Sequence, residues 1–456
     1  MHANDFAAIV NEARQVIVLS QVQDADLLPR QHTPPPLPMP TPVMRLLWGR
    51  PTLRFIHTSD WHLGHTLKEQ DRGPEHAAFL GWLTDRIRDE QPDALLIAGD
   101  VFDSANPPAS ALRAWYRFLV AAHGACPDMT VVAIAGNHDS GARLDAPRDL
   151  LGHFRVQVVG AAPRGATGDI DAAAMLVEVT NRAGQVLARV AAVPYLRPSD
   201  LPGGEDPEQW VEAIRSVYGA VFDAAPADGV PLLAMGHSYM VGGQVSDLSE
   251  RKILGGNLHA LPVDIFPDHV AYAALGHLHL AQRVGPRETV RYSGSPIPLA
   301  LDERGYPHQI CVVDVTPNEP TAIRKSAVPR TVAVPRVPVT GSLPLADVLA
   351  TLGAMSADKA AWIEVCVRAE STEVNARAAI EDVMVGKRAR VLAVSMEGGG
   401  STPGLADLTE STSLAEFEPE EVFRRKWNAT WPDEPLPDEM LALFHELLDA
   451  VAQESA

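Results

Sequence analysis

Short apolar runs alternate with amphipathic segments from residue 53 onward, which predicts strands that alternate with helices. The first apolar run covers residues 53–58, and the segment 74–91 follows it with Leu80, Leu83 and Ile87 at helical spacing. The pattern repeats, with predicted strands at 93–98, 130–135, 231–235, 270–275 and 290–293 and predicted helices at 108–123 and 208–222. Alternation of this kind favours a layered α/β core.

One pair of apolar runs predicts a hairpin instead. Residues 175–180 and 186–193 flank Asn181-Arg182-Ala183-Gly184, whose residue types favour a turn between antiparallel strands. We therefore expect mixed sheets, with both parallel and antiparallel neighbours, in a core domain at residues 51–315.

A smaller unit follows this core domain. The composition shifts near residue 316, with several prolines up to Pro338. The predicted elements beyond this point are helices at 345–355 and 373–385 and strands at 362–368 and 390–396. We interpret residues 316–400 as a smaller α+β accessory domain that caps the core.

The two ends of the chain differ from the rest. Residues 1–50 look like an added extension with a polyproline linker at 31–43, and we expect them to be disordered. Residues 401–456 contain an apolar helical stripe formed by Met440, Leu443, Phe444, Leu447, Leu448 and Val451. The stripe has two interpretations, a C-terminal helix packed on its own domain or a docking segment for a partner protein.

Composition and charge narrow the functional class. Apolar residues make up 46% of the 456 positions and charged residues 21%, as in soluble globular proteins. No apolar run approaches the roughly 18 residues that span a bilayer. The N-terminus is also a poor secretory signal, so we expect a cytoplasmic protein without membrane contact.

The net charge of −20 disfavours broad attraction to nucleic acid. It does not exclude an enzyme for nucleic acid, because bound divalent ions invert the local charge.

Five polar clusters lie near the ends of predicted strands. They are Asp60-Trp61-His62, Gly99-Asp100-Val101-Phe102-Asp103, Gly136-Asn137-His138-Asp139, Gly236-His237 and Gly276-His277-Leu278-His279. Strand ends in α/β folds aim side chains into a shared crevice, so residues distant in sequence can meet there. Each cluster alone is common, and only the ordered set of five indicates a site.

These clusters hold the residue types that a pair of metal ions requires. Two divalent ions about 3.5–4 Å apart can clamp the attacking and leaving oxygens of a phosphoryl transfer. Such a centre needs carboxylates to offset the charge, and imidazole ligands suit Mn, Fe and Zn better than Mg. The candidate ligands are Asp60, His62, Asp100, Asn137, His237, His277 and His279.

The order of the clusters resembles that of the calcineurin-like metallophosphoesterase superfamily. Longer strings narrow the resemblance to the family of SbcD nuclease subunits of the bacterial SbcCD complex. The strings are His57-Thr58-Ser59-Asp60-Trp61-His62-Leu63-Gly64, Gly136-Asn137-His138-Asp139-Ser140 and Tyr292-Ser293-Gly294-Ser295-Pro296-Ile297-Pro298-Leu299. The match covers residues 53–315 and is looser beyond them, and the first 50 residues depart from it. It implies a sandwich of two mixed sheets flanked by helices.

The resemblance also implies roles for individual residues. It implies that the site prefers Mn²⁺ and that the candidate ligands hold two ions. Asp60, His62 and His279 would bind one ion, Asn137, His237 and His277 would bind the other, and Asp100 would bridge the two. His138 would lie beside the ions and protonate the leaving oxygen, with Asp139 orienting its ring. A purely structural hydrogen bond is the alternative role for His138.

Other polar residues near the clusters are weaker candidates. We expect a structural role for Asp103, a surface or substrate-facing position for His65 and a packed position for His57. Arg143 follows the Asn-His-Asp turn and is a candidate substrate contact, with an ordinary surface charge as the equal alternative.

Together these features predict a metal-dependent DNA nuclease at residues 51–315. The family activity implies an exonuclease on duplex ends and an endonuclease on single strands or hairpins, in repair and recombination. The chain has no Gly-x-x-x-x-Gly-Lys-[Ser/Thr] loop, so we expect it not to hydrolyse ATP. The resemblance supplies an SbcC-type coiled-coil ATPase as partner and a homodimer within a heterotetramer. Residues 401–456 are the candidate docking segment for that ATPase.

Two other functions stay open on the sequence alone. One is a phosphoesterase for small substrates, such as a cyclic-nucleotide phosphodiesterase, which would need neither an accessory domain nor a C-terminal helix. The other is a non-catalytic scaffold, which would not need to keep all seven candidate ligands and His138. Comparing the turnover of a DNA hairpin with that of a cyclic nucleotide distinguishes the small-substrate phosphoesterase from the nuclease. Metal analysis of the purified chain tests the scaffold.

Overall fold

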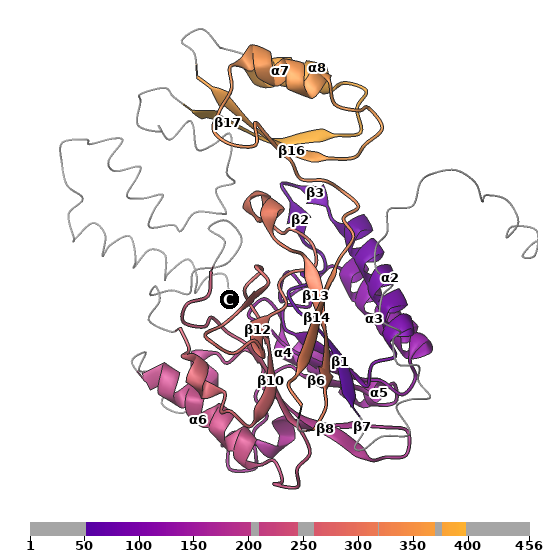
Figure 1. Ribbon diagram of the computed structural model, residues 1–456, viewed down its shortest axis with the longest axis vertical. Coiled ribbons are helices and arrows are strands. Elements are labelled where there is room, and N and C mark those ends of the chain that lie inside the picture. The colour runs from indigo at the N-terminus through magenta and orange to yellow at the C-terminus, as the bar shows by residue number, and fades with distance from the viewer. Residues whose placement is uncertain (1–51, 202–208, 245–259, 318, 370–375, 398–456) are drawn as a thin grey trace, which may run out of the picture. The chain divides into compact units, whose positions relative to one another are not determined.

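Two six-stranded sheets form the largest part of the chain (Figure 1). The computed structural model describes residues 52–201, 209–244, 260–317, 319–369 and 376–397. Both sheets contribute side chains to one buried apolar cluster, so they pack on each other. This confirms the sandwich of two mixed sheets that the sequence predicts.

The first sheet is parallel at its centre and antiparallel at one edge. Its strands are β1 (Leu53–Thr58), β4 (Ala94–Ala98), β5 (Thr130–Ile134), β6 (Val156–Val159), β13 (Gln309–Val315) and β14 (Ala322–Ala327). They lie in the order β14-β13-β1-β4-β5-β6, with β13 antiparallel to both of its neighbours. β4 and β5 are buried at every residue, as expected for apolar runs covered on both faces.

The second sheet carries the predicted hairpin at one edge. Its strands are β7 (Leu176–Thr180), β8 (Val186–Ala192), β9 (Leu232–His237), β10 (Val270–Gly276), β11 (Gln282–Arg283) and β12 (Val290–Tyr292). They lie in the order β11-β12-β10-β9-β8-β7. β7 and β8 are antiparallel, whereas β8, β9, β10 and β12 are parallel neighbours.

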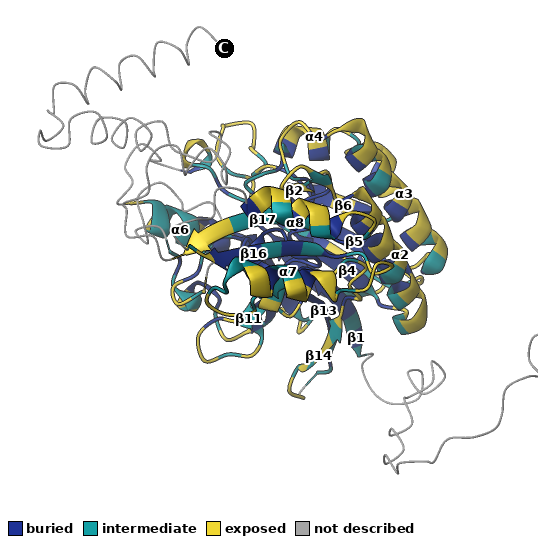
Figure 2. Cartoon of the chain, turned by 90° about the horizontal axis from the view of Figure 1, so that it is seen from above, coloured by how far each residue is buried: buried dark blue, intermediate teal, exposed yellow. Residues whose placement is uncertain are grey.

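Helices cover the outer faces of the sandwich. α2 (Gly73–Glu90) and α3 (Ala109–Ala125) pack on the first sheet through a second apolar cluster, and their outer faces are exposed (Figure 2). α6 (Trp210–Asp223) buries one face against the second sheet. The short helices are α4 (Gly141–Asp145), α5 (Arg148–Gly152), η2 (Ala173–Met175), η3 (Pro198–Asp200), η6 (Val263–Ile265) and η7 (Leu301–Gly305). Among the described helices, none has the length and apolar character needed to span a bilayer.

A smaller parallel sheet with two helices follows the sandwich in the chain. Its strands are β15 (Arg336–Val337), β16 (Trp362–Arg368) and β17 (Arg390–Glu397), and its helices are α7 (Leu345–Gly353) and α8 (Ala376–Met384). It has its own buried apolar cluster, to which Ile363, Val365 and Val367 of β16 contribute. Between β1 and α2, the strands β2 (Thr66–Leu67) and β3 (Gln70–Asp71) form a short antiparallel ribbon.

The structure differs from the sequence analysis at the end of the first sheet. β14 lies beyond residue 315, where we placed the end of the core domain, and yet it pairs along its whole length with β13. The core sheet therefore continues into the range assigned to the accessory domain. The predicted extension at 1–50 and the predicted docking segment at 401–456 lie outside the described residues.

Candidate metal centre

The five polar clusters sit where strands of the two sheets end. Asp60 and His62 follow β1, Asp100 follows β4 and Asn137 follows β5. From the second sheet, His237 is the last residue of β9, and β10 leads into His277 and His279. Parallel strands of both sheets therefore deliver these side chains to the same end of the sandwich.

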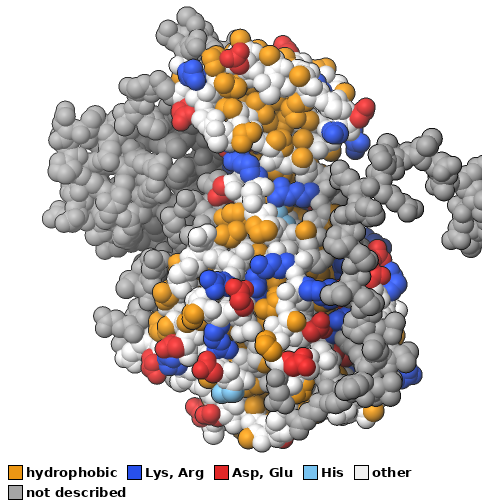
Figure 3. All heavy atoms as spheres, viewed as in Figure 1, with side chains coloured by type: hydrophobic (Ala, Val, Ile, Leu, Met, Phe, Trp, Pro, Cys, Tyr) orange, Lys and Arg blue, Asp and Glu red, His pale blue; other side chains and the backbone are white. Residues whose placement is uncertain are grey.

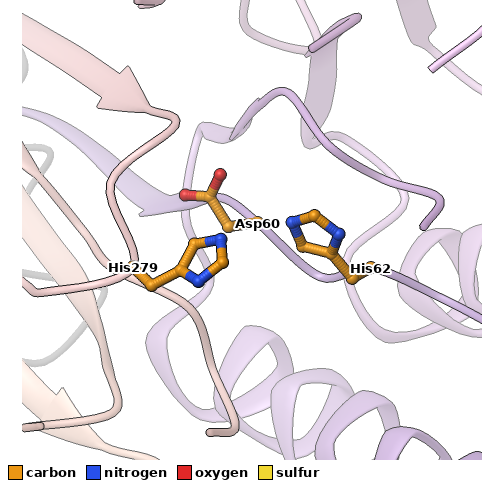
Figure 4. Close-up of side chains that lie close together, drawn as sticks. All are labelled: Asp60, His62 and His279. Atoms are coloured by element: carbon orange, nitrogen blue, oxygen red, sulfur yellow. The ribbon is translucent and has the colours of Figure 1, made fainter. Parts of the chain in front are cut away.

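Two groups made up only of candidate ligands bring potential metal-binding atoms close together. Asp60, His62 and His279 each place one such atom within 4.8 Å of the others, and all three side chains are buried. Figure 4 shows that Asp60 and His62 share the loop after β1, whereas His279 comes from a second loop, and that the side chains turn toward one another. The atoms of Asp60, Asp100 and His237 form a second buried group with the same limit. Asp60 belongs to both groups, so the two form one continuous centre.

Asp100 and Asn137 connect the remaining candidates to this centre. Oδ2 of Asp100 lies 3.5 Å from Nε2 of His62 and 3.3 Å from Nε2 of His237, so the carboxylate lies between the two imidazoles. Oδ1 of Asn137 lies 3.0 Å from Nε2 of His237 and 3.1 Å from Nδ1 of His277. All seven candidate ligands therefore converge. Which atom would bind which ion stays a prediction.

The donor set fits divalent cations. Nε2 of His62 is buried and makes no hydrogen bond among the described residues, which is costly unless another partner is present. The buried carboxylates of Asp60 and Asp100 likewise lie at the centre, where a cation would offset their charge. Carboxylate, amide and imidazole atoms together match the ligand preferences of Mn, Fe and Zn.

The protonation of the centre follows from burial and from the short distances. Burial raises the pKa of Asp60, against the lowering effect of His237 and His279. Burial also acts to raise the pKa of Asp100, but the charge and hydrogen bond of His237 outweigh it and hold that pKa well below its usual range. Burial acts to lower the pKa of His237, and the Asp100 carboxylate raises it to about 9. Burial and then the charge of His237 lower the pKa of His277 to about 3.

The loops that carry the ligands adopt rare backbone conformations. Asp60, His62 and Asp100 have φ values of 54°, 46° and 47°, and His277 has a φ of 108°. Residues other than glycine seldom occupy this region, and such strain clusters at functional sites. The sharp turns that result aim the side chains back over the strand ends.

The structure corrects the role that we expected for Asp139. His138 is half-buried, and its Nδ1 lies 2.8 Å from the carbonyl oxygen of Asp103, so this carbonyl orients the ring. The carboxylate of Asp139 turns away into the loops and accepts the backbone N–H groups of Val101, Phe102 and Gly136 at 2.9–3.1 Å. Asp139 therefore holds the β4 and β5 loops together, and the prediction that it orients His138 is wrong.

Asp103 and His65 support the centre from one side. Oδ1 of Asp103 lies 3.2 Å from Nδ1 of His62 and 3.0 Å from Nδ1 of His65. Burial acts to raise the pKa of Asp103, but these two hydrogen bonds outweigh it and hold the pKa far below its usual range. Nε2 of His65 also lies 2.9 Å from the carbonyl oxygen of Leu299. His65 is thus held between two partners while its side chain stays 21% exposed, and the expected surface or substrate-facing position stays a prediction.

Arginines near the centre differ in their surroundings. Arg143 is exposed on α4 and makes no ion pair among the described residues, so its contact with substrate stays a prediction. Arg197, which the sequence analysis missed, donates from Nη2 to the carbonyl oxygen of Asp139 at 3.0 Å and lies 5.7 Å from the ring centroid of Tyr195. That tyrosine ring lies 6.3 Å from the ring of His237. Arg197 follows Pro-Tyr-Leu in a loop, and no motif in the sequence marks it.

Two family models match the chain. One, described as calcineurin-like phosphoesterase, matches residues 53–281, which include all seven candidate ligands. The other, described as the type 5 capsule protein repressor C-terminal domain, matches residues 330–430. The first match lies on the sandwich that carries the centre.

The chain is also similar to three proteins that are each named as the SbcD subunit of the nuclease SbcCD. The one from Rhodobacter capsulatus is 42% identical over 309 residues, which cover 66% of this chain and 75% of the relative. The one from Escherichia coli K12 is 33% identical over 416 residues, which cover 88% and 99%. The one from Bacillus subtilis is 36% identical over 278 residues, which cover 59% and 67%.

Proposed function

The chain belongs to the calcineurin-like phosphoesterases and, among them, to the SbcD family of nuclease subunits, and from this premise we propose that it is a metal-dependent DNA nuclease. The proposed reactions are exonuclease cleavage at duplex ends and endonuclease cleavage of single strands or hairpins. The observation that carries the proposal is the convergence of buried carboxylates and imidazoles in two groups that share Asp60, each with its potential metal-binding atoms within 4.8 Å of one another. A bound cation would offset the charge of the carboxylates that are buried there.

We propose a pair of divalent ions, with manganese as the natural metal. The seven converging side chains would hold the ions, and four of the seven are imidazoles, which favour Mn over Mg. Bound divalent ions would supply electrophilic stabilisation of the phosphate and an activated water. The chain itself supplies the buried carboxylates of Asp60 and Asp100, whose charge would attract the ions.

His138 is the proposed proton donor to the leaving oxygen. A carbonyl oxygen can only accept, so the contact between Nδ1 of His138 and the carbonyl of Asp103 keeps a proton on Nδ1. Proton exchange with a substrate then takes place at Nε2. The ring centroid of His138 lies 4.8 Å from that of His62, which keeps this nitrogen beside the proposed ions. General acid catalysis of this kind contributes roughly 10²–10⁴-fold.

The proposal includes partners. The relatives are named as subunits of SbcCD, and this chain has no phosphate-binding loop of the ATPase type. We therefore propose that it works with an SbcC-type coiled-coil ATPase, as a homodimer within a heterotetramer, on DNA. A net charge of −20 makes a partner useful, because the chain alone attracts DNA weakly.

A direct comparison of substrates tests the function. The purified chain is incubated with Mn²⁺ or with a chelator, and with a labelled DNA hairpin, a linear duplex or a cyclic nucleotide. We expect cleavage of both DNA substrates in Mn²⁺ and none with the chelator. Efficient hydrolysis of the cyclic nucleotide without DNA cleavage would instead identify a small-substrate phosphodiesterase. Loss of all hydrolysis in fully metal-loaded protein would favour the scaffold.

A further inference from the structure

A buried carboxylate behind the metal centre has no part in the chemistry proposed above. Glu303 lies in η7 and is 0% exposed. Its Oε1 lies 2.7 Å from Nδ1 of His279, and its Oε2 accepts the backbone N–H of Leu299 at 2.7 Å. Both carboxylate oxygens are therefore engaged, and the side chain is held from two directions.

The contact with His279 determines which ring nitrogen faces the proposed ions. A carboxylate accepts hydrogen bonds, so the proton of His279 belongs on Nδ1 and the lone pair on Nε2. Nε2 is then the atom that joins Asp60 and His62 in the group of Figure 4. An ionised carboxylate with no exposure to water is costly unless positive charge compensates it. A cation on the far side of the imidazole would provide that compensation.

The backbone ties the same two regions together. The segment after β12 lies against the loop that carries His279, because the N–H of Ser295 donates to the carbonyl of His279 at 3.0 Å. Gly294 has a φ of +77°, and an added Cβ there would lie 2.7 Å from the same carbonyl oxygen. The segment from Gly294 to Glu303 therefore contacts His279 twice, at its backbone through Ser295 and at its ring through Glu303.

We infer that Glu303 is a positioning residue, which fixes the tautomer and the ring orientation of His279 and strengthens its binding of a divalent ion. Carboxylates that accept from ligand histidines typically contribute roughly 10–100-fold in metal affinity. The inference rests on the proposed function in one respect, that the centre binds divalent ions. It adds a residue that lies 24 positions from His279 in the sequence and belongs to none of the five clusters.

The test compares two Glu-to-Gln variants of the full chain. Glu303→Gln keeps the size of the side chain and removes its charge, and isothermal titration with Mn²⁺ should show roughly 10–100-fold weaker binding. Glu90→Gln is the matched control. Glu90 is also a largely buried carboxylate, but it pairs with Arg54 and Arg324 at the opposite end of β1 from the centre. This control should lose stability and keep its Mn²⁺ affinity.

The outcomes separate the inference from the proposed function. If the wild-type chain binds no Mn²⁺, the proposed metal centre fails. If the wild type binds Mn²⁺ and Glu303→Gln binds it within about two-fold, only the inference about Glu303 is overturned. If Glu303→Gln does not fold, ¹⁵N spectra of histidine-labelled wild-type protein loaded with Zn²⁺ can show which ring nitrogen of His279 carries the proton. A proton on Nδ1 of His279 supports the inference, and a proton on Nε2 overturns it.

Discussion

Most of the candidate histidine ligands are held by a partner on the ring nitrogen that faces away from the centre. These contacts set the ring orientations before an ion arrives, which is the arrangement that metal sites use to bind tightly. The pairs are His62 with the Asp103 carboxylate at 3.2 Å, His237 with the Ala98 carbonyl at 2.9 Å and His279 with Glu303 at 2.7 Å. The individual imidazoles of the centre are therefore preorganised.

His138 can be separated from the ligands by mutation. His138→Ala removes the proposed proton donor and leaves all seven candidate ligands in place. We expect unchanged Mn²⁺ stoichiometry and a kcat on DNA that falls roughly 10²–10⁴-fold. The exposed His153, which directly follows α5, offers a control, and His153→Ala should keep full activity. Wild-type turnover by His138→Ala would remove this residue from the mechanism.

His237 should release a proton when the centre fills. The Asp100 carboxylate raises the pKa of His237 from 6.5 to about 9, against burial, so the ring is charged at neutral pH without metal. A metal binds only neutral imidazole, and the proton must leave. Mn²⁺ affinity should therefore rise with pH and level off above about 9. Titration at pH 7 in two buffers of different ionisation enthalpy measures the release directly. Identical heats in both buffers would contradict it.

At the element scale, the ends of β4, β5, β9 and β10 meet so closely that some positions have no room for a side chain. An added Cβ at Gly136 would lie 2.1 Å from Oδ1 of Asp100, and one at Gly276 would lie 1.8 Å from the carbonyl oxygen of Ala98. The glycines therefore allow two sheets to bring their loops into one centre. They explain why four of the five polar clusters begin with glycine.

Gly136→Ala tests this close approach. Steric overlap should lower the free energy of unfolding by about 1–3 kcal/mol and displace Asp100, which would weaken Mn²⁺ binding. Gly81→Ala is the control, because Gly81 lies within α2 with no atom within 4 Å of an added Cβ. That change should stabilise the chain by about 0.5–1 kcal/mol, since alanine favours a helix. Urea unfolding in the presence of a chelator measures both. Equal stability of Gly136→Ala and wild type would refute the packing argument.

The sequence predicts several elements whose apolar positions face a core, although β13, which is buried at six of its seven residues, was missed. β1 and β16 have the predicted bounds, and α2 differs by one residue at each end, because their apolar positions face a core. β14 was missed because it is an edge strand whose residues are mostly exposed, so its sequence lacks an apolar run. β6 has only four residues and offers too short a pattern. Tertiary pairing, rather than local sequence, makes both of them strands.

The candidate site follows the same logic. The ligands could be found because each lies at a strand end beside a glycine or within a short motif. Glu303 could not be found, because it lies in a single 3₁₀ turn with no motif and meets His279 only through the fold. Asp139 was assigned the wrong partner because adjacency to His138 does not fix the direction of a side chain. Contacts between distant loops are the information that the sequence alone does not contain.

At the scale of the whole molecule, much depends on where the negative charge lies. Acidic and basic side chains are interspersed on the described part of the face in Figure 3, so that face has no single sign. Several carboxylates are instead buried at or beside the metal centre, namely Asp60, Asp100, Asp139 and Glu303, each at most 1% exposed. Some of the acidic groups that make up the net charge of −20 therefore lie at the centre, where divalent ions would offset their charge.

This burial predicts that divalent ions stabilise the entire fold. An ion present at about 100 times its dissociation constant adds roughly 2.7 kcal/mol. For a domain of this size that corresponds to a rise of roughly 4–5 °C in Tm. Thermal melts with Mn²⁺ and with a chelator measure the shift. Asp100→Asn is the control, because it removes the carboxylate between the two imidazoles and should abolish most of the shift.

The most direct test of the metal centre is anomalous diffraction at the manganese edge from crystals soaked in Mn²⁺. The arrangement of donors predicts two anomalous peaks about 3.5–4 Å apart. Both should lie among the seven side chains, with Asp100 contacting the two of them. An absence of peaks at this position in a crystal that binds Mn²⁺ elsewhere, or histidines that turn away from the ions, would contradict the proposed function at its foundation.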